Sequence, residues 1–109
     1  MKRTLVSVLT YNRFQLLNRC IDKIIDQTYS INELLIINNG STDNTESLLK
    51  SRNINYINLP KGGSAQGWNA AIEYAVNNNF DYIWLMDDDG YPHKNALKEI
   101  IEKFDDHTI

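Results

Sequence analysis

Apolar and polar residues along this chain follow two spacings that alternate four times. Four short apolar runs, each ended by polar or turn-forming residues, predict β-strands. Between and after them, apolar residues recur every three or four positions, as on the inner face of a helix. The predicted strands cover residues 4–10, 33–38, 54–59 and 82–86. The predicted helices cover residues 14–28, a segment from Ser41 or Asp43 to about Arg52, a segment around Trp68 to Val76, and a final segment after Pro92.

The apolar positions also predict which side of each helix faces the core. Pro92 suits the first turn of the last helix, because its fixed backbone angle is preorganised for that position. The residues expected to face the core are Leu17, Ile21, Ile24 and Ile25 in the first helix, Trp68, Ala71, Ile72, Ala75 and Val76 in the third, and Leu97, Ile100, Ile101 and Phe104 in the last. The fourth strand, Tyr82 to Met86, reads as a buried strand.

This pattern predicts one α/β domain over residues 1–109. Continuous apolar strands between helices are typical of a mostly parallel sheet covered on both faces, a Rossmann-like three-layer α/β/α sandwich. With right-handed crossovers, a doubly wound order of 3-2-1-4 places the first and fourth strands side by side. Ligands of such sheets bind beyond the carboxyl ends of the strands, where the strand order reverses.

Two polar segments are therefore expected to meet at this edge of the sheet. Thr10-Tyr11-Asn12-Arg13 follows the first strand, and Asp87-Asp88-Asp89 follows the fourth. Three neighbouring carboxylates repel one another, so a cation is expected beside them. Oxygen ligands suit Mg²⁺ or Mn²⁺, which one or two carboxylates often hold together with substrate phosphates. The alternative is a solvated acidic turn leading to Gly90 and Pro92.

Three other motifs each have a binding and a structural interpretation. Tyr11 can stack on a base and Arg13 can pair with phosphate, or their segment is an ordinary loop. Asn38–Asp43 suits a turn followed by a helix cap, although Asn38 can also recognise a base or a ribose. The Gly-rich segment Lys61–Asn69 either brings backbone and a helix N-terminus close to an anion or is a flexible loop.

Composition narrows the class of protein. A net charge of −3 without a basic cluster argues against a nucleic-acid surface. The apolar runs are shorter than the roughly 20 residues of a membrane span. The start of the chain is basic, but its apolar run is short and interrupted by polar residues, which predicts a first strand rather than a signal peptide. The single cysteine, Cys20, fits a reducing cytosol and is expected to be an unreactive core thiol.

Taken in order, four motifs resemble the nucleotide-binding half of family 2 glycosyltransferases with the GT-A fold, and the resemblance covers nearly the whole chain. Val6–Arg13 looks like the opening strand of that family, and Asn38–Asp43 like its second-strand turn. Gly62–Asn69 resembles its Gly-rich loop and helix. Asp87–Pro92 resembles its Asp-x-Asp metal motif, in the form seen in rhamnosyl- and galactofuranosyl-type transferases.

The resemblance implies a role for each matching residue. Asp87 and Asp89 would hold Mn²⁺ or Mg²⁺ at the diphosphate, with Asp88 or Asp87 near the ribose. Asn38 stands where the family commonly has an Asp that touches the base, which leaves the choice of nucleotide open. The residues implied to bind the sugar nucleotide are Thr10, Tyr11, Asn12, Arg13, Asn38, Lys61, Gly67, Asn69 and Asp88.

The same resemblance implies transfer of a sugar, with inversion, from a nucleoside diphosphate donor, with UDP- or dTDP-sugars favoured. The catalytic base and the site for a sugar, glycan or lipid-linked acceptor would lie in a second half. The chain would then be a truncated or stand-alone N-terminal half that is inactive alone. The full-length enzyme would lie in the cytoplasm, at the inner face of the membrane if its acceptor is there, and would serve polysaccharide synthesis.

Two other functions stay open. A non-catalytic module that binds a nucleotide sugar or assembles with other proteins would show the same motifs. A nucleotidyltransferase uses a similar sheet and acidic metal site, but residues 10–14 lack the Gly-rich phosphate loop expected after its first strand. A homo-oligomer is also expected, because the side of the fourth strand away from the first lacks a predicted neighbour.

Overall fold

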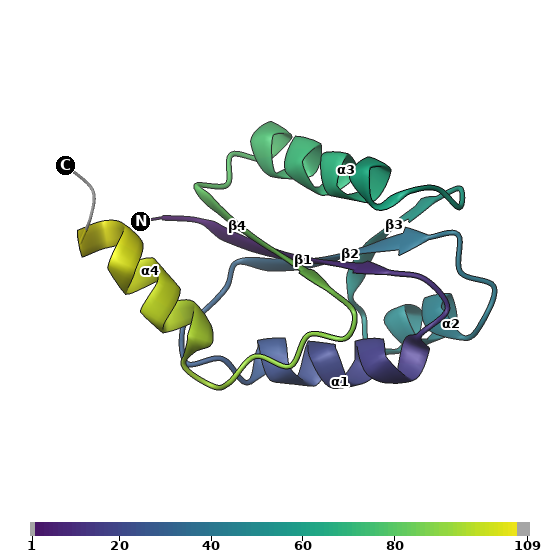
Figure 1. Ribbon diagram of the computed structural model, residues 1–109, viewed down its shortest axis with the longest axis horizontal. Coiled ribbons are helices and arrows are strands. Elements are labelled where there is room, and N and C mark those ends of the chain that lie inside the picture. The colour runs from purple at the N-terminus through teal and green to yellow at the C-terminus, as the bar shows by residue number, and fades with distance from the viewer. Residues whose placement is uncertain (1, 107–109) are drawn as a thin grey trace.

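The computed structural model describes residues 2–106 and contains four strands that alternate with four helices (Figure 1). The strands are β1 (Thr4–Thr10), β2 (Glu33–Asn39), β3 (Asn55–Leu59) and β4 (Tyr82–Asp87). The helices are α1 (Phe14–Ile25), α2 (Thr45–Ser51), α3 (Ser64–Asn77) and α4 (Ala96–Asp106). The strands form one parallel sheet in the order β3-β2-β1-β4, which confirms the predicted α/β class and topology.

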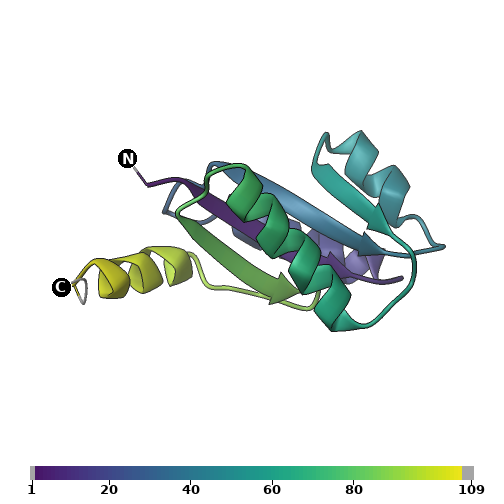
Figure 2. The same ribbon diagram turned by 90° about the horizontal axis from the view of Figure 1, so that it is seen from above.

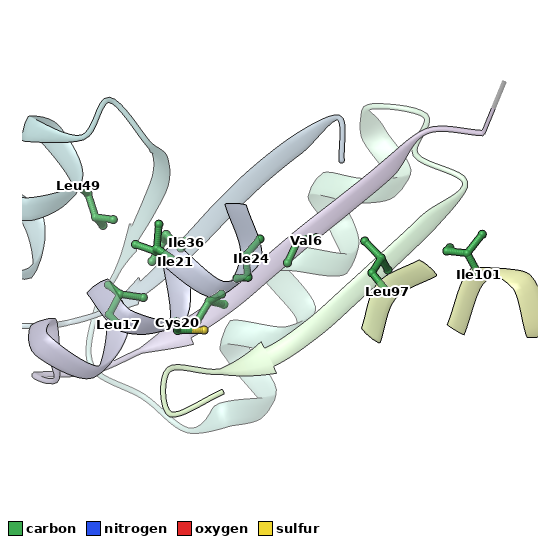
Figure 3. Packing of buried hydrophobic residues seen from close by; sticks show 10 residues of the cluster. Val6, Leu17, Cys20, Ile21, Ile24, Ile36, Leu49, Leu97 and Ile101 are labelled. Carbon is green, nitrogen blue, oxygen red and sulfur yellow. The ribbon is translucent and has the colours of Figure 1, made fainter. Parts of the chain in front are cut away.

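The sheet lies between two helical layers. Figures 1 and 2 show α3 over one face, with α1 and α2 over the other. Successive side chains of β1 point to opposite faces, so Leu5 and Leu9 pack toward α3 while Val6 and Val8 pack toward α1. The core on the α1 side also includes Leu97 and Ile101 of α4, and in the view of Figure 3 Leu97 lies between Val6 and Ile101.

The first helix is shorter than predicted, and the side chain that follows it connects it to α4. The helix ends at Ile25 rather than at residue 28. The Gln27 amide donates to the carbonyl oxygens of Lys23 and His93, 3.1 and 2.7 Å away, and its oxygen accepts from the backbone N–H of Leu97 at 3.0 Å. Gln27 thereby satisfies an open N–H in the first turn of α4.

Several predicted core positions lie on the surface instead. Pro92 precedes α4 by four residues rather than opening it, and of the four predicted core residues of α4 only Leu97 and Ile101 are buried. A helix buries only the stripe that faces its sheet, which is narrower than the apolar run predicted. The predicted core residues found exposed are Ile25, Ile72, Val76, Ile100 and Phe104, with 61, 44, 69, 38 and 60% of their surface accessible.

β4 lies at an edge of the sheet, and its residues 82–86 are half-buried, contrary to the prediction of a buried strand. Within residues 2–106 no strand pairs with its outer side. A groove of about 360 Å³ runs there between β4 and α4. It is lined mainly by apolar side chains, including Trp84, Ile100 and Phe104. Among the same residues, none of the helices has both the length and the apolar character needed to cross a lipid bilayer.

Candidate functional site at the carboxyl edge of the sheet

A cavity of about 340 Å³ opens at the carboxyl ends of the strands. Strand register brings its walls together, because Asp87 pairs with Leu9 and Asn38 pairs with Thr10 across neighbouring strands. The parallel order β2-β1-β4 places the loops that follow these strands at one edge. The lining residues are Leu9, Thr10, Tyr11, Arg13, Asn39, Lys61, Gly62, Ser64, Asp87, Asp88 and Asp89.

Asp88 is turned into the protein and joins the end of β1 to the turn after β4. Only 4% of its surface is accessible. Its carboxylate accepts a hydrogen bond from the Thr10 hydroxyl at 3.0 Å and lies 3.4 Å from the Arg13 guanidinium. A buried carboxylate is costly unless it is paired and hydrogen-bonded, and these two partners supply both interactions. The middle Asp of the triplet therefore positions its neighbours.

Asp87 and Asp89 are exposed and line the cavity on either side of buried Asp88. Within residues 2–106 no three acidic, histidine or cysteine side chains gather into a complete metal-binding cluster. Two accessible carboxylates nevertheless suit Mg²⁺ or Mn²⁺, because such ions usually take one or two protein carboxylates and complete their shell with water and substrate phosphates. The residues present fit a divalent ion that is shared with a phosphate-bearing ligand.

The turn that carries these carboxylates packs against the sulfur atoms of Met86 and Cys20. Gly90 donates its backbone N–H to the carbonyl oxygen of Asp87 at 3.0 Å and closes the turn. A Cβ atom at Gly90 would lie 3.1 Å from Met86 Sδ and 3.5 Å from Cys20 Sγ, so a side chain would crowd both. Burial, reinforced by the charge of Asp88, raises the pKa of the Cys20 thiol to about 11. Cys20 is buried and fits the predicted unreactive core thiol.

The Gly-rich loop is held against the cavity by Asn39. The Asn39 side-chain N–H donates to the carbonyl oxygen of Gly62 at 2.8 Å, and its oxygen accepts from the Gly62 N–H at 3.1 Å. Gly40 has a φ of 79°, and a Cβ there would lie 2.6 Å from the backbone nitrogen of Lys61. Only glycine allows this approach. The approach places the Lys61 ammonium 4.9 Å from the centre of the Tyr11 ring.

Asn12 and Asn38, both predicted to bind the nucleotide, do not line the cavity. Asn12 has a φ of 51°, and its side-chain oxygen accepts from the backbone N–H groups of Thr42 and Asp43 at 2.7 and 3.2 Å. Asn38 is buried and donates from its side chain to the Asn58 oxygen at 3.0 Å. In this structure the two amides shape the surrounding loops.

Gly67 and Asn69 also lie outside the lining. Gly67 is buried where α3 crosses β1, and a Cβ there would come within 2.3 Å of the Leu9 side chain. Asn69 is exposed on α3. Of the predicted nucleotide-binding residues, the cavity brings together Thr10, Tyr11, Arg13, Lys61 and Asp88, beside the predicted metal ligands Asp87 and Asp89.

Four lining residues are not among those predicted from the sequence: Leu9, whose apolar side chain belongs to β1, and Asn39, Gly62 and Ser64. Asn39 is adjacent to the predicted Asn38, and its position after an apolar strand was an available signal. Gly62 lay within the noted Gly-rich segment. Ser64 begins α3 on the cavity wall, and no side chain caps this helix terminus, which leaves its backbone N–H groups open to an anion.

Comparisons with known proteins agree with this architecture. The profile of the family described as glycosyl transferase family 2 matches residues 5–109. A chondroitin synthase and a hyaluronan synthase from Pasteurella multocida are each 32% identical over 104 residues, covering 91% of this chain and 10% of theirs. An uncharacterized glycosyltransferase from Mycoplasma genitalium is 30% identical over 105 residues, covering 91% of this chain and 35% of its own.

Solved structures share the fold. TarS from S. aureus superposes with a TM-score of 0.82 at 23% identity, over 96% of this chain and 20% of TarS. A mannosyltransferase from Pyrobaculum calidifontis, in complex with GDP-Man and Mn²⁺, gives a TM-score of 0.80 at 24% identity, over 98% and 33% of the two chains. The chain thus spans a tenth to about a third of the length of these proteins. With the profile match over residues 5–109, these findings show that the chain belongs to glycosyl transferase family 2.

Proposed function

We propose that residues 1–109 form the donor-binding region of a sugar transferase that takes a nucleoside diphosphate sugar together with Mg²⁺ or Mn²⁺. One observation carries this proposal: Asp87 and Asp89 open onto the same cavity as Tyr11, Arg13 and Lys61. Exposed carboxylates, an aromatic ring and two cations match the metal, base and phosphate groups of such a donor.

The chemistry of the walls supports a role for each group. Arg13 pairs with Asp88 and has a side chain that is 56% accessible, so it can still donate toward a phosphate oxygen. Lys61 also lines the cavity and can place its ammonium near the same group. Asp87 and Asp89 would hold the divalent ion, which when bound supplies Lewis-acid stabilisation of the leaving diphosphate.

The donor nucleotide is proposed from both the site and the structural relatives. Among the solved relatives, TarS is in complex with UDP-GlcNAc and the Pyrobaculum mannosyltransferase with GDP-Man. Tyr11 can stack on any base, because stacking does not depend on the hydrogen-bonding pattern of its edge. We propose a UDP- or dTDP-sugar, in keeping with the sequence resemblance, and transfer with inversion by the complete protein in the cytoplasm.

An Asp89→Asn variant tests the metal-dependent donor site by calorimetric titration with UDP, GDP and dTDP sugars, with and without Mn²⁺. Loss of one ligand and one charge is expected to remove most of the metal-dependent affinity, at least about tenfold. Asp26→Asn, an exposed change after α1 and outside the cavity lining, is the matched control and should bind like the parent. Equal binding by Asp89→Asn and the parent would show that the metal role is wrong.

We further propose that these 109 residues bind the donor without transferring its sugar efficiently. Among the described residues that line the cavity, the carboxylates are assigned to the metal and to Thr10 and Arg13, which leaves none as the base for an acceptor hydroxyl. Such a base is typically worth 10²–10⁴-fold in rate. Sugar release and transfer to added acceptors can be followed by mass spectrometry. Rapid transfer by this chain alone would contradict the proposal and exclude a purely non-catalytic module.

A further inference from the structure

Outside the cavity, one surface cluster combines an aromatic ring with two cations. The Tyr91 ring lies against α1, with the Arg19 guanidinium 4.8 Å and the Lys23 ammonium 4.6 Å from its centre. Arg19 and Lys23 are four residues apart, so they occupy the same face of the helix. Tyr91 remains 59% accessible, which leaves much of the ring open to solvent.

The two cations of this cluster have no acidic partner. Among residues 2–106, the ion pairs join Arg13 to Asp88, Arg52 to Asp22 and His93 to Glu99, and none includes Arg19 or Lys23. The nearby carboxylate of Asp22 is engaged by Arg52 at 2.9 Å. In a chain with a net charge of −3, Arg19 and Lys23 are two neighbouring cations whose charges stay available to an anion.

The position of the cluster relates it to the donor cavity. Tyr91 follows the turn closed by Gly90 and lies two residues after Asp89, which lines the cavity. In Figure 1 the segment after β4 leaves the carboxyl edge of the sheet and runs back along α1. A ligand held on Tyr91 would therefore lie on the segment that continues directly from Asp89 at the wall of the proposed donor cavity.

We propose that Arg19, Lys23 and Tyr91 form a subsite for an acceptor carbohydrate that carries an anionic group, a phosphate or a carboxylate. The apolar face of a sugar ring packs on the open aromatic ring, and the anion takes charge-assisted hydrogen bonds from the two cations. This inference rests on the proposed donor function, because it assigns the second substrate of the same reaction. The cluster determines which acceptor is selected and does not touch the reacting metal ligands.

Nuclear magnetic resonance titration of the ¹⁵N-labelled chain tests this assignment. The probes are glucose 6-phosphate, glucuronate, neutral glucose and inorganic phosphate. The two anionic sugars, or one of them, are expected to shift the amide of Tyr91 and the side-chain signals of Arg19, while glucose is not. Weakening as salt rises is also expected, because exposed charges are screened. The phosphate and carboxylate sugars, compared directly, identify the anion.

Matched variants separate binding from folding. Arg19→Gln with Lys23→Gln keeps the aliphatic stems and removes both charges, and affinity for the anionic sugar is expected to fall about fivefold or more. Tyr91→Leu should weaken sugar binding, whereas Tyr91→Phe should retain it. Lys50→Gln with Lys98→Gln removes two exposed charges elsewhere and should change nothing. Thermal unfolding of each variant shows whether it is folded.

Three results would overturn the inference: no shift with either anionic sugar, equal binding by the Arg19→Gln, Lys23→Gln variant, or inorganic phosphate that binds as tightly as glucose 6-phosphate. A UDP titration with Mn²⁺ on the same samples keeps the two proposals apart. Intact donor binding without a response to anionic sugars contradicts the acceptor subsite alone. Anionic-sugar binding at Tyr91 without donor binding contradicts the proposed function instead.

Discussion

The Thr10 hydroxyl donates a hydrogen bond to the buried carboxylate of Asp88, and this contact links two residues 78 positions apart. It fixes the end of β1 to the turn after β4, so the two walls of the cavity cannot move independently. The Asp88 carboxylate has one other side-chain partner among residues 2–106, the Arg13 guanidinium at 3.4 Å, which is half exposed. The short, buried contact with Thr10 is therefore the stronger constraint.

Thr10→Val should lower the free energy of unfolding by about 1–3 kcal/mol, because it leaves a buried carboxylate without its hydroxyl partner. Thr10→Ser retains the hydroxyl and loses only a methyl group, so its cost should be clearly smaller. Urea unfolding followed by circular dichroism measures both. Identical midpoints for the two variants would show that the hydrogen bond has no net effect on stability.

Asn39→Ala should release the Gly-rich loop, since it removes both hydrogen bonds to Gly62. Loss of about 1 kcal/mol of local stability would speed amide exchange at Gly62 roughly fivefold. Asn38→Ala is the matched control, because its amide bonds to Asn58 and not to the loop. Hydrogen exchange measured by magnetic resonance tests the pair, and equal acceleration in both variants would contradict the assignment.

Cys20 should resist thiol reagents in the folded protein. With its pKa raised from 9.0 to about 11, the thiolate fraction at pH 8 is about 100-fold smaller than for an ordinary cysteine. The thiol ionises more readily in the unfolded chain than in the folded protein. The free energy of unfolding therefore keeps its full value below pH 9 and falls as the pH rises from 9 toward 11. Labelling with Ellman's reagent in buffer and in urea measures the contrast. Fast labelling of the folded chain would refute it.

Thr4→Val should leave stability unchanged or raise it slightly. The Thr4 hydroxyl is buried and has no hydrogen-bond partner among the described residues, so replacing it with a methyl group removes a desolvation cost. Ser7→Ala is the contrasting variant on the same strand, since the Ser7 hydroxyl donates to the Leu35 carbonyl at 2.9 Å. Its expected cost is about 1 kcal/mol. Denaturant unfolding of both variants decides the matter, and a large loss for Thr4→Val would point to a buried water.

Self-association is expected at the outer side of β4. The outer edge of β4 pairs with no strand among residues 2–106, and with the exposed apolar residues Ile100 and Phe104 beside it, this edge favours contact with a second copy. Sedimentation at micromolar concentration should show a dimer or larger species that Ile100→Glu weakens. Val76→Glu, an exposed apolar position on α3, is the control. A single monomeric species for the parent would contradict this expectation.

The sheet order was predictable because mainly apolar strands alternate with helices and each crossover has one favoured hand. The same pattern does not determine which side chains point into the cavity. In β2 the residues Leu34–Ile37 are apolar on both faces of the strand, so no alternation of apolar and polar residues shows which face each side chain takes. The sequence therefore does not decide whether Asn38 or Asn39 points into the cavity. Asp87, Asp88 and Asp89 are identical residues, so the sequence does not indicate that Asp88 is the one that turns inward. An apolar run also cannot distinguish the edge strand β4 from a central one.

The pairing of β1 with β4 has a consequence for how the protein folds. During synthesis β1, β2 and β3 emerge first and can pair through crossovers of modest length, but β4 must close a loop of more than seventy residues against β1. Asp87 ends β4, and Asp88 and Asp89 follow it, so these carboxylates take their places only when β4 pairs with β1. The binding edge is therefore expected to form late, and local opening of β4 would dismantle it while the rest of the sheet persists. A ligand that binds tightly to this edge would then raise the free energy of that local opening.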